Sequence, residues 1–78
     1  MEYDTDKVDD MVLALLFLTT FQEHGQKRTW KGMDWDAMDR LFEKGYIYDP
    51  KRKTKSVALT DEGAKRSEEI FKKYFVKP

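Results

Sequence analysis

The sequence predicts an α+β fold: a small winged-helix-like domain, three α-helices with a two-stranded antiparallel β-hairpin (the wing) between helices 2 and 3. Two observations lead to this class. A segment of helical pattern stops at Gly45 and is followed by a short strand-like run, 46–48. After a basic turn, a second strand-like run, 56–59, leads into Thr60 and two acidic residues, which is how a capped helix begins. At 78 residues the chain fits one domain, residues 1–78.

The first helix is expected from about Thr5 to about Phe21. Its first turns carry acidic residues, which suit the positive end of a helix dipole: Asp6, Asp9 and Asp10. From Met11 to Leu18 nearly every position is apolar, so the helix must be buried on more than one side. Two alternatives follow: the helix runs through the centre of the fold, or one of its faces meets a second copy of the chain.

The second helix has clear signals at both ends, whereas the polar segment 22–32 before it is expected to be a loop. Asp34 is a good N-cap, and Met33 with Met38 occupies the positions of a hydrophobic staple. Gly45 supplies the left-handed residue that ends the helix. The expected buried face consists of Trp35, Met38, Leu41 and Phe42.

The two predicted strands of the wing are joined by the basic connection 49–55. Period-two alternation directs Ile47, Val57 and Leu59 toward the core. The third helix then begins with Thr60 as N-cap. Its inward stripe is expected to be Ala64, Ser67, Ile70, Phe71, Tyr74 and Phe75, with the small Ser67 marking a close contact.

Charge and composition narrow the range of functions. The 15 basic and 15 acidic residues cancel, yet residues 1–24 carry a net charge of −5 and residues 45–60 a net charge of +3. The absence of cysteine excludes disulfides and thiolate metal sites, and no signal-peptide pattern is visible, so a cytoplasmic protein is expected. The longest apolar run is too short to span a bilayer, so no membrane association is expected.

The basic side chains are the main candidate for function. Lys51, Arg52, Lys53 and Lys55 at the hairpin tip, together with Lys27, Arg28 and Lys31, could lie against the phosphates of DNA, with weak and non-specific binding expected. The alternative is a solubilising turn whose charges keep a short edge from pairing. The acidic face of helix 2, formed by Asp36, Asp39 and Glu43 with Arg40 as an expected partner of Asp36, disfavours a recognition helix there.

Apolar side chains support a second class of function, in which the partner is another protein or a second copy of the chain. The candidate interaction residues are Trp30, Leu13, Phe17, Phe71 and Phe75. His24 is the single histidine and is expected to be exposed in a loop. Because no nucleophile, oriented base or ligand cluster can be assembled, no catalytic residue, metal or cofactor is expected, and the chain is not expected to be an enzyme.

Two resemblances add to these expectations. Residues 41–63, with Lys44-Gly45-Tyr46-Ile47 and Val57-Ala58-Leu59-Thr60 around the basic turn, resemble the wing of MarR- and PadR-type transcriptional regulators, which implies a winged helix. The chain departs from them because no clear helix precedes helix 2. Over nearly its whole length it is more similar to a small bacterial family, a domain of unknown function, through Asp4–Leu16, Trp30-Lys31-Gly32, Asp34-Trp35 and Lys55-Ser56-Val57. That resemblance implies no activity or cofactor.

Overall fold

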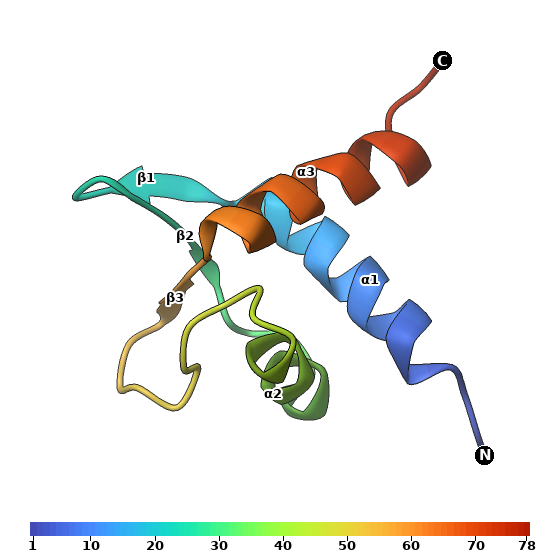
Figure 1. The fold of residues 1–78 in the computed structure, drawn as a ribbon, viewed down its shortest axis with the longest axis horizontal. Coiled ribbons are helices and arrows are strands. Elements are labelled where there is room, and N and C mark those ends of the chain that lie inside the picture. The colour runs from blue at the N-terminus through green and yellow to red at the C-terminus, as the bar shows by residue number, and fades with distance from the viewer.

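A computed structural model describes all residues, 1–78, and shows three α-helices and a three-stranded antiparallel sheet (Figure 1). In chain order the elements are α1 (Thr5–Leu16), a short 3-10 helix η1 (Phe17–Thr19), β1 (Phe21–Glu23), β2 (Gln26–Trp30), α2 (Trp35–Glu43), β3 (Ser56–Ala58) and α3 (Asp61–Tyr74). The strands lie in the order β1-β2-β3. In Figure 1 the β1–β2 hairpin and the loop before β3 lie to the left, and the helices to the right. The predicted α+β class and the three helices are confirmed.

The segment 22–32, expected to be a loop, instead forms most of the β1–β2 hairpin. Glu23 pairs with Gln26, so only His24 and Gly25 form the turn between the strands. Both residues have positive φ, 50° and 77°, as a two-residue type I′ turn requires. Histidine tolerates this conformation better than most residues, but it is a weaker turn signal than Asn-Gly. The loop prediction was wrong, because His24 and Gly25 were not recognised as a hairpin turn.

The predicted wing is wrong in its strand layout. β3 pairs with β2, with Thr29 opposite Val57 and Trp30 opposite Ser56. The segment 46–48 contributes one isolated bridge, between Ile47 and Leu59. The longer β2 offers β3 three paired positions, and the alternation that buries Val57 also buries Thr29 beside it. No two-stranded hairpin lies between α2 and α3.

Helix α1 ends at Leu16 rather than near Phe21, and the chain turns there into η1. The carbonyl oxygen of Leu16 accepts hydrogen bonds from the hydroxyls of Thr20, at 2.8 Å, and Thr29, at 2.9 Å. These bonds satisfy a carbonyl that has no partner within the helix, and they tie its end to the centre of β2. The sequence pattern missed this end because apolar residues continue past it.

Both ends of α2 agree with the sequence prediction. The Asp34 carboxylate accepts a hydrogen bond from the Ala37 amide at 3.1 Å. Gly45 has a φ of 83°, and the amides of Gly45 and Tyr46 donate to the carbonyls of Phe42 and Leu41 at 3.0 Å each. This pair of bonds is the Schellman motif that commonly follows a helix.

The buried face of α2 differs from the prediction. Ala37, Met38 and Leu41 are buried, but Trp35 is 70% exposed and Phe42 is also exposed. Trp35 occupies the first position of α2, and its side chain lies largely in solvent. The expectation of Trp35 as a core residue is therefore wrong, and truncating it should not open a cavity.

The core lies where α1 packs on α2 and α3. Its apolar members come from all three helices and from β3, together with the bridged pair Ile47 and Leu59: Val12, Leu13, Ala14, Leu16, Ala37, Met38, Leu41, Ile47, Val57, Leu59 and Ile70. The predicted close contact at Ser67 is confirmed, because its buried hydroxyl donates to the Leu13 carbonyl at 2.7 Å. Thr60 caps α3 as predicted and accepts from the Gly63 amide at 2.9 Å.

One carboxylate, Asp9 of α1, is fully buried and is paired with two bases of α2. Arg40 Nε lies 3.0 and 2.8 Å from its two oxygens, and Lys44 Nζ lies 2.9 Å from Oδ2. Lys44 also reaches the exposed Asp6 at 2.9 Å. Arg40 therefore pairs with α1, and the predicted pair with Asp36 is not formed. Burial raises the pKa of Asp9, but the hydrogen bonds and charges of Arg40 and Lys44 outweigh it, so this pKa lies below the ordinary value.

Replacing Asp9 with asparagine should lower the free energy of unfolding at neutral pH by about 3 kcal/mol, because it leaves two cations without their buried partner. A carboxylate with a lowered folded-state pKa stabilises the fold above its unfolded pKa, near 3.9, and loses that contribution as pH falls through the folded value. Urea unfolding followed by circular dichroism between pH 7 and pH 2 measures both effects. The Asp9→Asn variant should have the shallower acid dependence, and Asp10→Asn, at an exposed ion pair, is the control. An unchanged acid dependence in Asp9→Asn would contradict this account.

Gly63 of α3 lies against the backbone of Tyr46, which belongs to the Schellman motif at the end of α2. A Cβ atom built on Gly63 would lie 1.7 Å from the carbonyl oxygen of Tyr46. Because that carbonyl also accepts the Thr60 amide at 3.1 Å, it is not free to move. Gly63→Ala should therefore cost at least about 2 kcal/mol of unfolding free energy. Gly32→Ala, with no atom within 4 Å of the added carbon, is the matched control. Equal stability of the two variants in urea unfolding would refute the close approach.

Candidate nucleic-acid interface

The outer face of the sheet, directed away from the buried Thr29, is built from alternate residues of β2. Arg28 and Trp30 lie on this face. Phe21 of β1 lies opposite Arg28 on one side, and Ala58 of β3 lies opposite it on the other. The Phe21 ring contacts Trp30 with 6.4 Å between ring centroids. An arginine is therefore placed between aromatic and small apolar neighbours.

Arg28 of β2 and Lys31, which follows β2, hold the loop 49–55 and the adjoining Ser56 beside the sheet. Arg28 donates to the Ser56 hydroxyl at 2.9 Å and to the Ser56 carbonyl at 3.1 Å. Lys31 Nζ donates to the Pro50 carbonyl at 2.8 Å and to the Arg52 carbonyl, and the Lys31 amide donates to the Lys55 carbonyl at 3.3 Å. The basic loop is thereby fixed against the end of β2.

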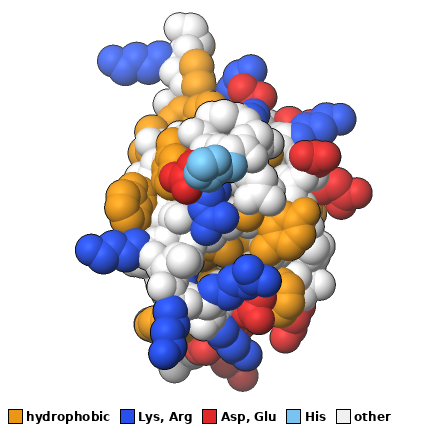
Figure 2. All heavy atoms as spheres, turned by 90° about the vertical axis from the view of Figure 1, so that its left-hand side faces the viewer, with side chains coloured by type: hydrophobic (Ala, Val, Ile, Leu, Met, Phe, Trp, Pro, Cys, Tyr) orange, Lys and Arg blue, Asp and Glu red, His pale blue; other side chains and the backbone are white.

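The four predicted loop bases, Lys51, Arg52, Lys53 and Lys55, are exposed, and none of them forms an ion pair. Lys and Arg side chains are spread over the lower half of the face seen in Figure 2, with hydrophobic side chains between them. Arg28 and Lys31 thus lie beside the loop, and both are half-buried: Lys31 bonds to the loop backbone and Arg28 to Ser56, which follows the loop. Lys27 is the exception, because its side chain points to the opposite face of the sheet.

A hollow of about 450 Å³ lies between the outer face and the loop. Its lining is mainly polar: Glu23, Gln26, Arg28, Tyr48, Asp49, Arg52, Thr54, Ser56, Val57 and Ala58. Two arginines face two carboxylates here, but Asp49 is engaged, since its Oδ1 accepts from the Lys51 amide at 2.9 Å. The hollow therefore offers two arginines, the Glu23 carboxylate, a phenol ring and hydroxyls to a ligand, and its positive character comes from the adjoining loop bases rather than from its own lining.

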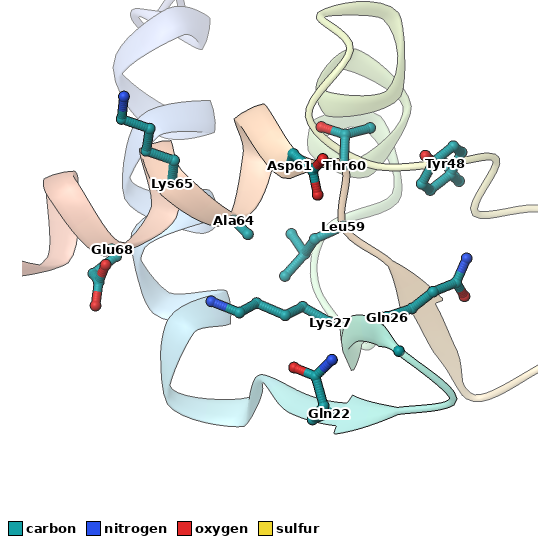
Figure 3. A pocket seen from close by; sticks show the side chains of 11 residues that line it. Gln22, Gln26, Lys27, Tyr48, Leu59, Thr60, Asp61, Ala64, Lys65 and Glu68 are labelled. Carbon is teal, nitrogen blue, oxygen red and sulfur yellow. The ribbon is translucent and has the colours of Figure 1, made fainter.

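A second hollow, of about 490 Å³, lies on the inner side between the hairpin and the start of α3 (Figure 3). Lys27 extends across it, and Gln22 points toward Lys27 from β1. Lys65 and Glu68 of α3 and Asp61 complete a lining of mixed sign. With two lysines and two carboxylates, this hollow shows no preference for a charged ligand of either sign.

The predicted interaction residues are separated by the fold. Leu13 is 0% exposed in the core, so its assignment to a contact surface is wrong. Phe17, Phe71 and Phe75 form a row, with centroid separations of 4.9 and 5.5 Å, in which Phe75 is exposed and the other two are half-buried. Trp30 is 51% exposed and lies apart from this row, on the outer face of the sheet.

His24 is exposed in the hairpin turn, as predicted. No three His, Cys, Asp or Glu side chains gather in a way that could hold a metal ion. None of the helices has the length and apolar character needed to cross a membrane.

Sequence reasoning missed two residues of the outer face, Phe21 and Tyr48. Phe21 was assigned to the end of the first helix, and Tyr48 to a strand of the wing. The alternation of Lys27, Thr29 and Lys31 with Arg28 and Trp30 was the available signal for β2, but five residues of mixed polarity resemble a polar loop.

Comparison with known proteins gives one family and one close relative. The model of a domain of unknown function, DUF6429, matches residues 4–77. An uncharacterized protein, y4hR, of Sinorhizobium fredii (strain NBRC 101917 / NGR234) is 54% identical over 77 residues, which is 99% of this chain and 100% of the relative. No solved structure matches.

Proposed function

The chain belongs to the DUF6429 family, and we propose that it is a nucleic-acid-binding module, with no catalytic role, that contacts phosphates through the loop 49–55 and the adjoining end of β2. One observation carries this proposal. Lys31 and Arg28 bond to backbone and side-chain groups of residues 50–56, so bases far apart in the sequence belong to one surface. Phosphate contacts from clustered Lys and Arg supply most of the affinity in non-specific binding.

The charge distribution supports the same proposal. Arg40 of α2 and Lys44, which follows this helix, are engaged by Asp9 and Asp6, whereas the loop bases have no acidic partner. A neutral chain therefore keeps a local positive surface, which suits weak and sequence-tolerant binding. In this proposal the loop acts as the wing of a winged helix does. Helix α2, with acidic Asp36, Asp39 and Glu43, is not used to read bases.

Reversing Lys51, Arg52, Lys53 and Lys55 to glutamate should abolish binding of labelled DNA at low salt, because like charges then face the phosphates. Fluorescence anisotropy from about 20 to 200 mM salt measures affinity and its salt dependence, and the native protein should lose affinity steeply over this range. The matched control reverses four exposed bases of the C-terminal region, Lys65, Lys72, Lys73 and Lys77. Absence of native binding at low salt, or equal loss in the control, would refute the proposal.

A second candidate function, self-association, is favoured by a different observation. The row of Phe17, Phe71 and Phe75 ends at the surface, and Leu18 and Val76 are 67% and 54% exposed. Apolar side chains in such positions are typical of contact surfaces between subunits. A two-fold dimer through this row would leave the basic loop free.

Sedimentation of the native chain at micromolar concentration tests the dimer. It should give a species of twice the 9.3 kDa chain mass, and Phe75→Glu should return it to the monomer. Trp35→Glu, at an exposed aromatic of α2, is the control and should remain dimeric. A single 9.3 kDa species across a wide concentration range would exclude self-association.

A further inference from the structure

The outer face of the sheet exposes two aromatic rings beside the basic loop. Trp30 is 51% exposed and Tyr48 is 54% exposed. The Tyr48 amide donates to the Ala58 carbonyl at 3.0 Å, which places Tyr48 at the far edge of the same face. Arg28 lies opposite Ala58. Arg28 thus lies in one row across the strands with Phe21 on one side and Ala58 and Tyr48 on the other.

The Trp30 ring is held in place by a neighbouring ring, and the backbone of Tyr48 is held by its bond to Ala58. Trp30 contacts the half-buried Phe21 with an interplanar angle of 49°, and its backbone is paired with Ser56. Tyr48 borders the hollow that Arg28 and Arg52 also line. A ring fixed in this way loses little conformational freedom when a flat group stacks on it, which favours binding.

The chemistry of these groups matches unpaired nucleotides. The face of a base is available for stacking only when the base is not enclosed between its neighbours in a duplex. Proteins that bind single strands combine a basic surface for the backbone with aromatic rings for the bases. A chain of zero net charge, with four free cations on its loop, has limited attraction for phosphates alone. Stacking would supply the remainder, whereas a duplex offers no bases to Trp30 and Tyr48.

We infer that the outer face of the sheet binds single-stranded nucleic acid in preference to duplex, with bases stacked on Trp30 and Tyr48 and phosphates on the loop 51–55. This inference rests on the proposed function and names its substrate class. Arg28 of β2 and Arg52 of the loop line the same hollow as Tyr48, where the sugar-phosphate backbone would pass. The Glu23 carboxylate also lines the hollow and repels phosphates, which limits how many of them this face accepts.

Fluorescence anisotropy with a labelled 15-nucleotide oligothymidylate and a labelled 15-base-pair duplex at the same low salt tests the inference. The single strand should bind roughly tenfold more tightly. Trp30→Ala and Tyr48→Ala should each weaken single-strand binding by roughly tenfold, the scale of one lost stacking contact, and leave duplex binding unchanged. Trp35→Ala, which removes a still more exposed aromatic from α2, should have no effect. Trp30→Phe and Tyr48→Phe, which retain a ring, should bind nearly as well as the native chain, and circular dichroism checks that each variant is folded.

The outcomes separate this inference from the proposal beneath it. If the duplex binds as tightly as the single strand, and the two alanine variants bind both normally, the preference for single strands is overturned while the proposed function stands. If neither probe binds the native chain at low salt, both are overturned. If the alanine variants weaken both probes equally, the rings do not select unpaired bases, and the inference is overturned.

Discussion

Strand β2 uses both of its edges, and the arrangement of the molecule depends on this. One edge pairs with β1 through a turn of two residues, and the other pairs with β3, which lies 25 residues later in the sequence. The buried Thr29 of this strand also donates to the Leu16 carbonyl at the end of α1. A single short strand therefore joins the first helix, the hairpin and the loop before β3. Because Arg28 and Trp30 belong to β2, the pairing of β2 with β3 fixes the position of the basic loop relative to these two side chains.

The distribution of charge follows from the packing of the helices. Burial of Asp9 requires cationic partners, and Arg40 and Lys44 of α2 supply them. The acidic residues Asp6 and Asp9 and the bases Arg40 and Lys44 thus neutralise one another. The loop bases are left unpaired, although the chain as a whole has no net charge. This uneven distribution of charge is not apparent from the composition, because it depends on which charged side chains the fold brings together.

The sequence predicted those features that depend on local signals. Asp34, Gly45 and Thr60 define helix ends through hydrogen bonds within a few residues, and each acts as expected. Pairing between distant segments was not predictable in the same way. Nothing in residues 26–30 indicates that they pair with β3. The helical pattern placed Trp35 on the buried face of α2, whereas this first residue of the helix is exposed. Likewise the loop bases were recognised from their sequence, whereas Tyr48 and Phe21 joined the candidate site only through strand pairing.

Long-range nuclear Overhauser contacts between backbone protons test this arrangement most directly. The account predicts contacts between Thr29 and Val57, and slow hydrogen exchange at the Leu59 amide, which donates to the Lys27 carbonyl at 2.8 Å. A regular ladder between residues 46–48 and 56–59, with no contacts from residues 26–30 to β3, would contradict it. In that case β2 would not be the central strand, and the outer face that joins Arg28 and Trp30 to the basic loop would not exist.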